Sequence, residues 1–306
     1  MYSFKRILAA IDFSNIDETV IRYLSFLCGI IRPEKIYFVN IQRDLDVPEG
    51  IREKFPELNR PQDEKLREEM MQLVQANFPG FENFDIEYDV VEGSPLPEML
   101  RWTHIKNVDL AVVGKKTESE GSGMLAQQMA RKGSCSVLFV PNSAQAKLEK
   151  FFTAIDFSEN AKLALEEGWR LAQQHKDAGL FCYHTYNLPL GFYKTGKTEE
   201  EFAAIMLENA KSKCANFISE LNIPHERITA LFELEEKKSV AEMITRAAEQ
   251  NNADLILVGA KGRTNITAML LGSVAEKLIK LDKNIPLLVV KQKDKSFKFL
   301  DFIKNV

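Results

Sequence analysis

The sequence lacks the cysteine patterns that mark several classes of protein. Its four cysteines, Cys28, Cys135, Cys182 and Cys214, lie far apart, with no CxxC pair and no cysteine–histidine cluster at the spacing of a zinc site. Buried thiols in a reducing compartment are the simplest explanation of this pattern. A zinc-stabilised or disulfide-stapled domain is therefore not expected.

An excess of charge of one sign and long apolar runs are also missing. The 40 basic and 44 acidic side chains leave a net charge of -4, so the protein as a whole has no positive field to attract a nucleic-acid backbone. The apolar run at residues 7–11 is too short for a signal-peptide core or a membrane span. We expect a soluble, cytoplasmic protein with no nucleic-acid partner and no membrane partner.

What the sequence does contain is a long internal repeat. The five letters AIDFS at residues 10–14 recur at residues 154–158, an offset of 144 (156 minus 12 for the two aspartates). Glu98 falls on Glu242 at the same offset. Solenoid repeats have periods of roughly 20–50 residues, and this period is far longer, so it indicates duplicated domains. We predict one domain at residues 1–143.

The second predicted domain spans residues 149–292. Residues 293–306 carry apolar side chains at helical spacing, which predicts a helical C-terminal tail that docks on the chain's own core. With 45% hydrophobic and 27% charged residues, the composition is that of an ordinary globular protein, which can bury a core in each domain.

Within each copy, short β-rich apolar runs alternate with segments of helical period. The pattern predicts βαβ units and a parallel sheet covered on both faces. The predicted strands are 6–11, 35–41, 85–91, 110–113 and 136–140 in the first copy, and 151–155, 180–186, 228–234, 255–258 and 286–290 in the second. The fold class is therefore α/β, with two tandem doubly wound five-stranded parallel sheets of Rossmann-like type, whose ligands bind at the carboxyl ends of the strands. Ser14 and Ser158 are the expected N-caps of the first helix in each copy.

A glycine-rich loop follows the fourth strand of the second copy. Gly259 and Gly262 are followed by nine residues and then by Gly272 and Ser273, which open a helical run at residues 274–280. Glycine lets the backbone approach phosphate oxygens, and the N–H groups and dipole of a helix start favour an anion. The loop is neither a Walker A motif nor a GxGxxG fingerprint. On the residues alone, a glycine turn before a helix explains the loop equally well.

The side chains near the loop suit the same kind of ligand. Lys261 and Arg263 would supply local positive charge, and Ser273 would supply a hydroxyl donor. Asp156, at the end of the first strand, has two roles that stay open: it binds the ligand, or it hydrogen-bonds the turn before the helix. Asp12 holds the same position in the first copy, which weakens the ligand role, whereas the glycine loop opposite Asp156 favours it.

With this loop, the chain resembles the universal stress protein family in its tandem two-domain form, over roughly residues 4–292. The ATP-binding members of that family carry a Gly-x2-Gly-x9-Gly-Ser/Thr loop, which Gly259, Gly262, Gly272 and Ser273 match without a gap. The resemblance implies an adenine nucleotide α-hydrolase-like fold and an ATP molecule whose triphosphate lies across the loop.

The resemblance also assigns positions around the ligand. Ala154 would line the pocket, Thr185 and Val258 would lie against the adenine, and Val274 would continue the loop into the last helix. Asp156 would serve the ribose or a magnesium ion. In this family the domains associate through their last strands, so the two copies are expected to form an internal pseudo-dimer, and two chains a homodimer.

The first copy departs from the pattern in its loop. Four residues are missing between Gly114 and Gly123 relative to the second copy, and Thr117 replaces the second glycine. Glu118 and Glu120 place negative charge where phosphates would lie, and this charge opposes ATP. The sequence therefore predicts one ATP per chain, in the second copy.

Three functions follow, in order of preference. The first is a non-enzymatic, ATP-binding stress-response module. The second is a slow ATPase or adenylyl-handling enzyme, although neither a HxGH-type histidine pair nor a SGGxDS-type loop is found. The third is a nucleotide-free interaction scaffold. His184 is expected in the core or at the pocket edge rather than as a base, and residues 233–238 are expected to be a solvated strand end.

Overall fold

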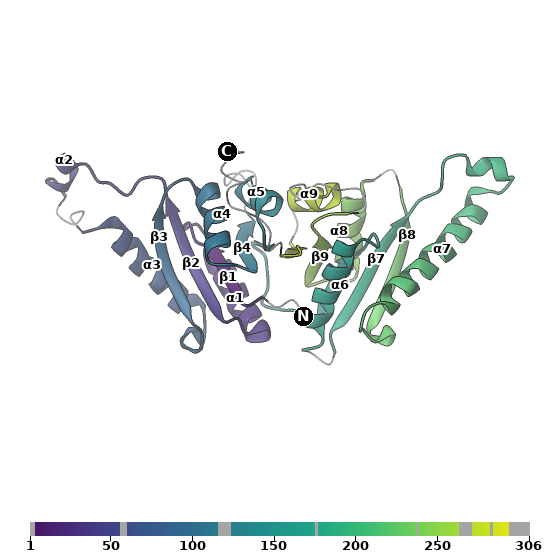
Figure 1. The fold of residues 1–306 in the computed structure, drawn as a ribbon, viewed down its shortest axis with the longest axis horizontal. Coiled ribbons are helices and arrows are strands. Elements are labelled where there is room, and N and C mark those ends of the chain that lie inside the picture. The colour runs from purple at the N-terminus through teal and green to yellow at the C-terminus, as the bar shows by residue number, and fades with distance from the viewer. Residues whose placement is uncertain are drawn as a thin grey trace. The chain divides into compact units, whose positions relative to one another are not determined.

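The computed structural model describes residues 4–55, 60–115, 124–174, 177–236, 238–262, 271–281 and 284–293. The chain forms two compact units: Lys147–Lys291 make up the second, and the rest of the described chain makes up the first. Each unit contains a twisted sheet with helices packed against it (Figure 1).

The first unit has five strands, and every strand pair described is parallel. The strands are β1 (Arg6–Ala10), β2 (Lys35–Gln42), β3 (Ile86–Glu92), β4 (Leu110–Lys115) and β5 (Ser136–Pro141), in the spatial order β3-β2-β1-β4-β5. The helices are α1 (Asp17–Ile31), α2 (Glu49–Arg52), α3 (Gln62–Asn77), α4 (Pro95–Ile105) and α5 (Met124–Lys132), with a short 3-10 helix η2 (Phe81–Asn83).

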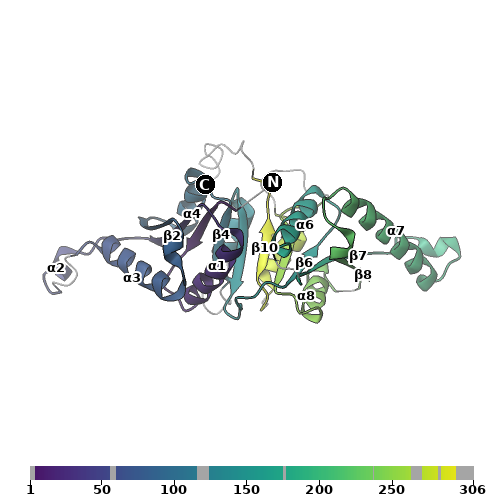
Figure 2. The same ribbon diagram turned by 90° about the horizontal axis from the view of Figure 1, so that it is seen from below.

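The second unit repeats this arrangement. Its strands are β6 (Lys150–Ala154), β7 (Gly179–Tyr186), β8 (Ile228–Leu234), β9 (Leu255–Gly259) and β10 (Leu287–Val290), in the order β10-β9-β6-β7-β8. Its helices are α6 (Glu159–Ala172), α7 (Glu199–Ser219), α8 (Val240–Gln250) and α9 (Ser273–Lys280), with 3-10 helices η4 (Phe192–Thr195) and η5 (His225–Arg227). Figure 2 shows α1 and α3 over one face of the first sheet, and α6 and α7 over one face of the second.

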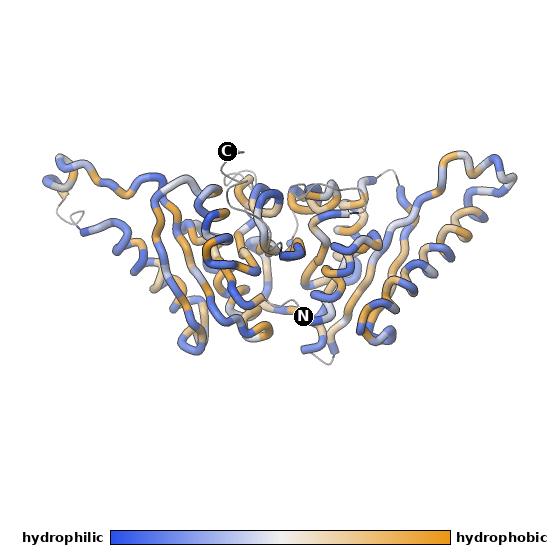
Figure 3. The backbone as a smooth tube through the Cα atoms, in the orientation of Figure 1, coloured by the Kyte–Doolittle hydropathy of each residue, from blue (hydrophilic) through white to orange (hydrophobic). Residues whose placement is uncertain are grey.

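These observations confirm the predicted fold class. Both sheets are parallel and doubly wound, because the chain moves outward from the first strand and then returns to its other side. Each predicted strand lies within two residues of the observed one. The central strands are buried on both faces, because the adjacent residues Ile7 and Leu8 of β1, like Phe151 and Phe152 of β6, point to opposite faces and are all 0% exposed. Figure 3 shows apolar residues running along the strands of both units. Strands of this kind read as continuous apolar runs, which is why the sequence located them.

The prediction that Ser14 caps the first helix is wrong. Helix α1 begins at Asp17 after Ile16, which makes no side-chain cap hydrogen bond, and the Ser14 hydroxyl is buried with no partner among the described residues. The Ser158 prediction is correct, because its Oγ accepts a hydrogen bond from the Ala161 N–H at 3.2 Å. The two helices therefore start differently although the letters before them are identical.

The predicted alignment of Glu98 with Glu242 is also wrong, by one residue. Helices α4 and α8 begin after the N-caps Ser94 and Ser239, which are 145 positions apart (239 minus 94). The third strands of the units are 142 apart, since β2 pairs with β3 and β7 with β8 in the same register. The second unit therefore has three more residues between its third strand and the following helix.

Several predictions stay untested by the fold. The expected pseudo-dimer would use β5 and β10, and each of these strands stands at the end of its own unit's order. The pairing of two chains likewise stays a prediction. Of the predicted helical tail at residues 293–306, only Lys293 is described. Within the described ranges, no helix is long and apolar enough to cross a membrane.

Candidate functional site

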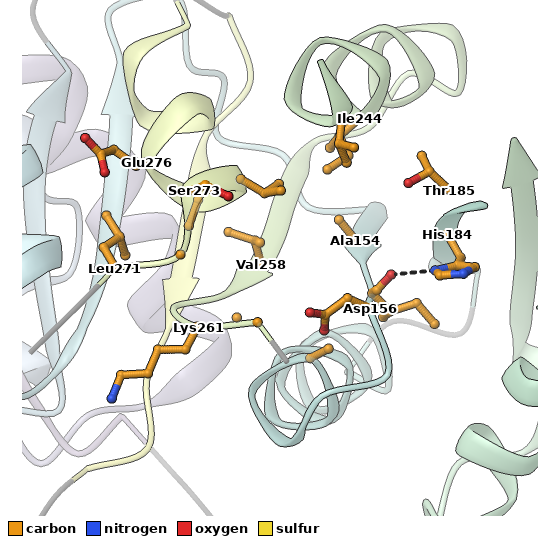
Figure 4. Close-up of a pocket in the computed structure, with 18 of the residues that line it drawn as sticks. Ala154, Asp156, His184, Thr185, Ile244, Val258, Lys261, Leu271, Ser273 and Glu276 are labelled. Atoms are coloured by element: carbon orange, nitrogen blue, oxygen red, sulfur yellow. Dashed lines mark hydrogen bonds between the residues drawn. The ribbon is translucent and has the colours of Figure 1, made fainter. Parts of the chain in front are cut away.

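A cavity of about 430 Å³ opens at the carboxyl edge of the second unit's sheet. It is lined by the ends of β6, β7 and β9, the residue after β8, and the first turns of α6, α8 and α9 (Figure 4). This edge is where the strand order reverses around β6 and β9, which is the expected position of a ligand in a doubly wound sheet.

Nearly all of the residues predicted for the site meet in this cavity. Those lining it are Ala154, Asp156, Thr185, Val258, Gly259, Lys261, Gly262, Gly272, Ser273 and Val274. Arg263 lies outside the described residues, as do most of the residues that separate Gly262 from Gly272. The lining thus brings together side chains more than a hundred positions apart, although their roles toward a ligand stay predictions.

The floor of the cavity is the turn between β6 and α6. Asp156 Oδ1 accepts a hydrogen bond from the Ser158 N–H at 3.1 Å, and Phe157 between them has a left-handed backbone with φ 64°. This is the turn role that the sequence left open for Asp156, and it uses one carboxylate oxygen. A Cβ added at Gly262 would lie 2.6 Å from Asp156 Oδ2, so the loop passes directly over that carboxylate and a side chain there would push the carboxylate aside.

His184 stands at the edge of the cavity. Its Nδ1 donates to the Ile155 carbonyl at 3.0 Å, because a carbonyl can only accept. Its ring packs on that of Phe157 with centroids 4.3 Å apart, and Phe157 in turn contacts Phe217 of α7 at 5.6 Å. The histidine thereby joins β7 to the strand-end turn, which agrees with the predicted pocket-edge position.

The middle of the cavity is an apolar slot. Ala154 and Val258 are 8% and 7% exposed, and Ile244 of α8 is 2% exposed. Figure 4 shows Ile244 above and Val258 and Ala154 below the open space. A flat aromatic group would gain hydrophobic contact on both faces in such a slot.

The glycine loop closes one end of the cavity. The Gly272 N–H donates to the Ala260 carbonyl at 2.7 Å, and the Ala260 N–H donates to the Val290 carbonyl at 2.9 Å, so both ends of the loop are held against the sheet. The hydroxyl of Ser158 donates to the Lys261 carbonyl at 3.4 Å. Helix α9 begins at Ser273, which places the positive end of its dipole at this end of the cavity.

Packing alone is sufficient to explain Gly259, so this glycine is not evidence for a ligand, although it lines the cavity. A Cβ there would lie 2.6 Å from the carbonyl carbon of Asn160 in α6. Gly114, at the same place in the first unit, is pressed in the same way against Ile16, with its added Cβ 2.7 Å from Cγ2. Glycine avoids a close contact at this position in both units, so its presence does not distinguish a phosphate loop.

The charges of the described lining are mainly negative. Asp156, Glu235 and Glu276 contribute carboxylates against the single ammonium group of Lys261. The N-terminus of α9 and Lys261 favour an anion at one end, but a polyanion would also need a counter-cation near the carboxylates. Within the described chain no group of three acidic, histidine or cysteine side chains is placed to hold a metal by itself. A metal would therefore need ligand oxygens together with Asp156.

Several lining residues escaped the sequence analysis. Ala161, Val240 and Ile244 are apolar helix residues whose letters do not separate a pocket wall from a core contact. Glu235 is exposed, as expected of the predicted solvated strand end, but it also lines the cavity, which the sequence did not indicate. The helical spacing of Val240 and Ile244, at i and i+4 after the N-cap Ser239, is a signal that could have placed both on the face toward the sheet.

Comparison with known protein families and proteins finds relatives of both halves of the chain. The model of the Universal stress protein family matches residues 3–141 and again residues 148–291. "Universal stress protein MJ0577" of Methanocaldococcus jannaschii is 30% identical over 174 residues, which are 48% of this chain and 96% of that protein.

One solved structure agrees with the fold over nearly the whole chain. A universal stress protein from Archaeoglobus fulgidus is 17% identical with a TM-score of 0.61, covering 96% of this chain and 99% of its own. A universal stress protein solved in complex with cAMP is 16% identical, with a TM-score of 0.33 over 45% of this chain and 98% of its own. Since the family model covers most of both halves, the chain belongs to the universal stress protein family.

Proposed function

We propose that the second unit binds one ATP molecule per chain and that the protein acts as a nucleotide-responsive, non-enzymatic stress-response module. The observation that carries the proposal is the cavity itself, which joins an apolar slot to the N-terminus of α9 within a single unit. A nucleotide has the same division, with a flat base at one end and phosphates at the other.

The base and the phosphates take opposite ends in this proposal. The base lies between Ala154, Val258 and Ile244, and the phosphates lie against Lys261, Ser273 and the loop. The ribose then comes near Asp156, because β6 stands between β7 and β9. Backbone N–H groups at the helix start and the hydroxyl of Ser273 supply hydrogen bonds to the phosphate oxygens.

A magnesium ion belongs to the proposal because of the charge of the lining. The lining carries three carboxylates and one lysine, and Glu276 has a second cation beside it, Lys280 at 3.0 Å. A bare triphosphate would add to that negative charge. Mg²⁺ bound to phosphate oxygens and Asp156 would offset the repulsion. Chelation should then weaken ATP binding more than adenosine binding, which calorimetry with each ligand would measure. Equal losses for the two ligands would remove the metal from the proposal.

Titration calorimetry of the full chain with ATP and Mg²⁺ tests the central claim. We expect a single site per chain. Two equivalent sites, or no heat change together with no nucleotide released from the heated protein, would overturn it. Chromatography of the same sample over time tests whether the protein hydrolyses ATP. Steady conversion of ATP to ADP would contradict a non-enzymatic module.

A further inference from the structure

The end of the cavity away from the glycine loop carries two hydrogen-bond acceptors that nothing so far explains. Thr185 at the end of β7 donates its hydroxyl proton to Glu235 Oε1 at 3.1 Å. That leaves the lone pairs of Thr185 Oγ1 and the second oxygen of Glu235 as acceptors, since an ionised carboxylate cannot donate. Figure 4 places Thr185 on the opposite side of the cavity from Ser273 and Lys261.

The position of Glu235 is fixed by the sheet. Its N–H donates to the Tyr186 carbonyl at 2.7 Å, which continues the β7–β8 ladder one residue past the end of β8. In the order β9-β6-β7-β8, Glu235 lies three strands from the loop that follows β9. At about 4.8 Å between strands this separation is roughly 14 Å, which places Glu235 beyond the ribose, where the base ends.

We propose that Glu235, together with Thr185, is the specificity-determining pair of the site and selects a base with an exocyclic amino group. The inference rests on the proposed function. A 6-amino group offers two N–H donors, one for Glu235 and one for Thr185. A 6-oxo group offers only lone pairs at that atom. These would face the acceptor-only carboxylate of Glu235, and Thr185 could donate to them only by giving up its hydrogen bond to Glu235.

The first unit supplies an internal contrast. Gly93 donates its N–H to the Gln42 carbonyl at 2.8 Å, which is the same backbone hydrogen bond as that of Glu235. Ile41 holds the ladder position of Thr185. Neither Gly93 nor Ile41 has a polar side chain, so the acceptor pair is present at these aligned positions of the second unit alone.

Two nucleotides that differ only at the 6-position test the proposal. Calorimetry on the full chain with Mg²⁺ compares ATP with inosine triphosphate, which keeps the phosphates and the ribose and replaces the amino group by an oxygen. We expect ATP to bind about tenfold more tightly, the low end for a hydrogen bond to a charged acceptor that is partly exposed.

The variant Glu235→Gln keeps the shape of the side chain and gives it an N–H donor. It should weaken ATP and strengthen inosine triphosphate, so that the ratio of their affinities falls to about twofold or less. Glu236→Gln is the matched control, because it changes the charge equally while Glu236 pairs with Arg246 at 3.4 Å and is not part of the lining. Melting temperatures of both variants check that they fold.

The possible results distinguish a failure of base selection by Glu235 from a failure of the proposed nucleotide binding. If the wild-type chain binds both triphosphates equally, or if Glu235→Gln leaves the ratio unchanged, the selection by Glu235 is wrong while nucleotide binding stands. A loss of inosine triphosphate affinity in Glu235→Gln would mean that the carboxylate binds the ring N–H instead, which also overturns the proposal. If neither triphosphate binds, the proposed function fails and this inference fails with it.

Discussion

The turn after the first strand has nearly the same hydrogen bonds in the two units, but the residues packed next to that turn differ. Asp12 and Asp156 accept from the N–H of the serine two residues on, at 3.2 and 3.1 Å. Asn40 takes the place of His184 and donates to the Ile11 carbonyl at 2.7 Å. The shared contacts hold the turn together in either unit, so they are properties of the fold.

The difference lies one helical turn further along. Ala161 of the second unit lines the cavity, and the aligned residue of the first unit is Asp17, which is 3% exposed. Asp17 Oδ2 accepts from the N–H of Asp12 at 3.0 Å, so a buried carboxylate reaches into the space that corresponds to the cavity floor. The first unit therefore has a second carboxylate beside the shared turn, and we expect this added negative charge to oppose an anion there.

The largest effect on ATP affinity should come from placing the carboxylate of the first unit at the equivalent position of the second unit. Ala161→Asp in the second unit would fill the floor and repel phosphates, and we expect ATP affinity to fall by about a hundredfold or more. Calorimetry measures the loss. Ala161→Asn has nearly the same bulk without the charge and should lose less. Asp17→Ala should leave the affinity of the second unit unchanged, and undiminished binding by Ala161→Asp would break the comparison.

The two strand-end glycines should respond differently to a methyl group. Gly259→Ala would meet the backbone of Asn160, which cannot move away, and we expect it to lower the free energy of unfolding by about 2–3 kcal/mol. Gly114→Ala would meet the side chain of Ile16, which can change its rotamer, and should lower it by about 1 kcal/mol. Urea unfolding of the full chain checks both values. If the Gly259→Ala protein has normal stability but no longer binds ATP, then Gly259 is required for ligand binding and not for packing.

The smallest effect concerns the serines of the repeated letters. Ser158→Ala removes an N-cap and should lower the free energy of unfolding by about 1 kcal/mol. Ser14 does not cap α1, so Ser14→Ala should change stability by less than about 0.5 kcal/mol. Thermal unfolding monitored by circular dichroism compares the two. Equal losses would show that the serines have one role despite the different helix starts.

The strands and their order could be predicted because each strand is a buried apolar run between helices, and this pattern determines a parallel sheet. The loop could be recognised because glycine at fixed spacing is a visible signal. The repeat offset of 144 already aligns Asp17 with Ala161 (161 minus 17), but the sequence does not show that this position lines a cavity. Alanine has no chemical signature of its own.

Glu235 escaped for a geometric reason. The chain beyond β8 is three residues longer than in the first unit, so the repeat no longer indicates which of the acidic residues faces the cavity. The structure resolves this, because the hydrogen bond from the Glu235 N–H to the Tyr186 carbonyl fixes the position of Glu235 relative to β7. Thr117, Glu118, Glu120 and Gly123 fall outside the described residues, so the shortened loop of the first unit stays a prediction.

The left-handed phenylalanines, Phe13 with φ 58° and Phe157 with φ 64°, also say something about ancestry. A residue other than glycine in this conformation costs roughly 1–2 kcal/mol, and both units keep the same unfavourable choice at the same place. Two independent origins of that choice are far less economical than one. The shared turn therefore points to a single ancestral domain that already had it before the duplication.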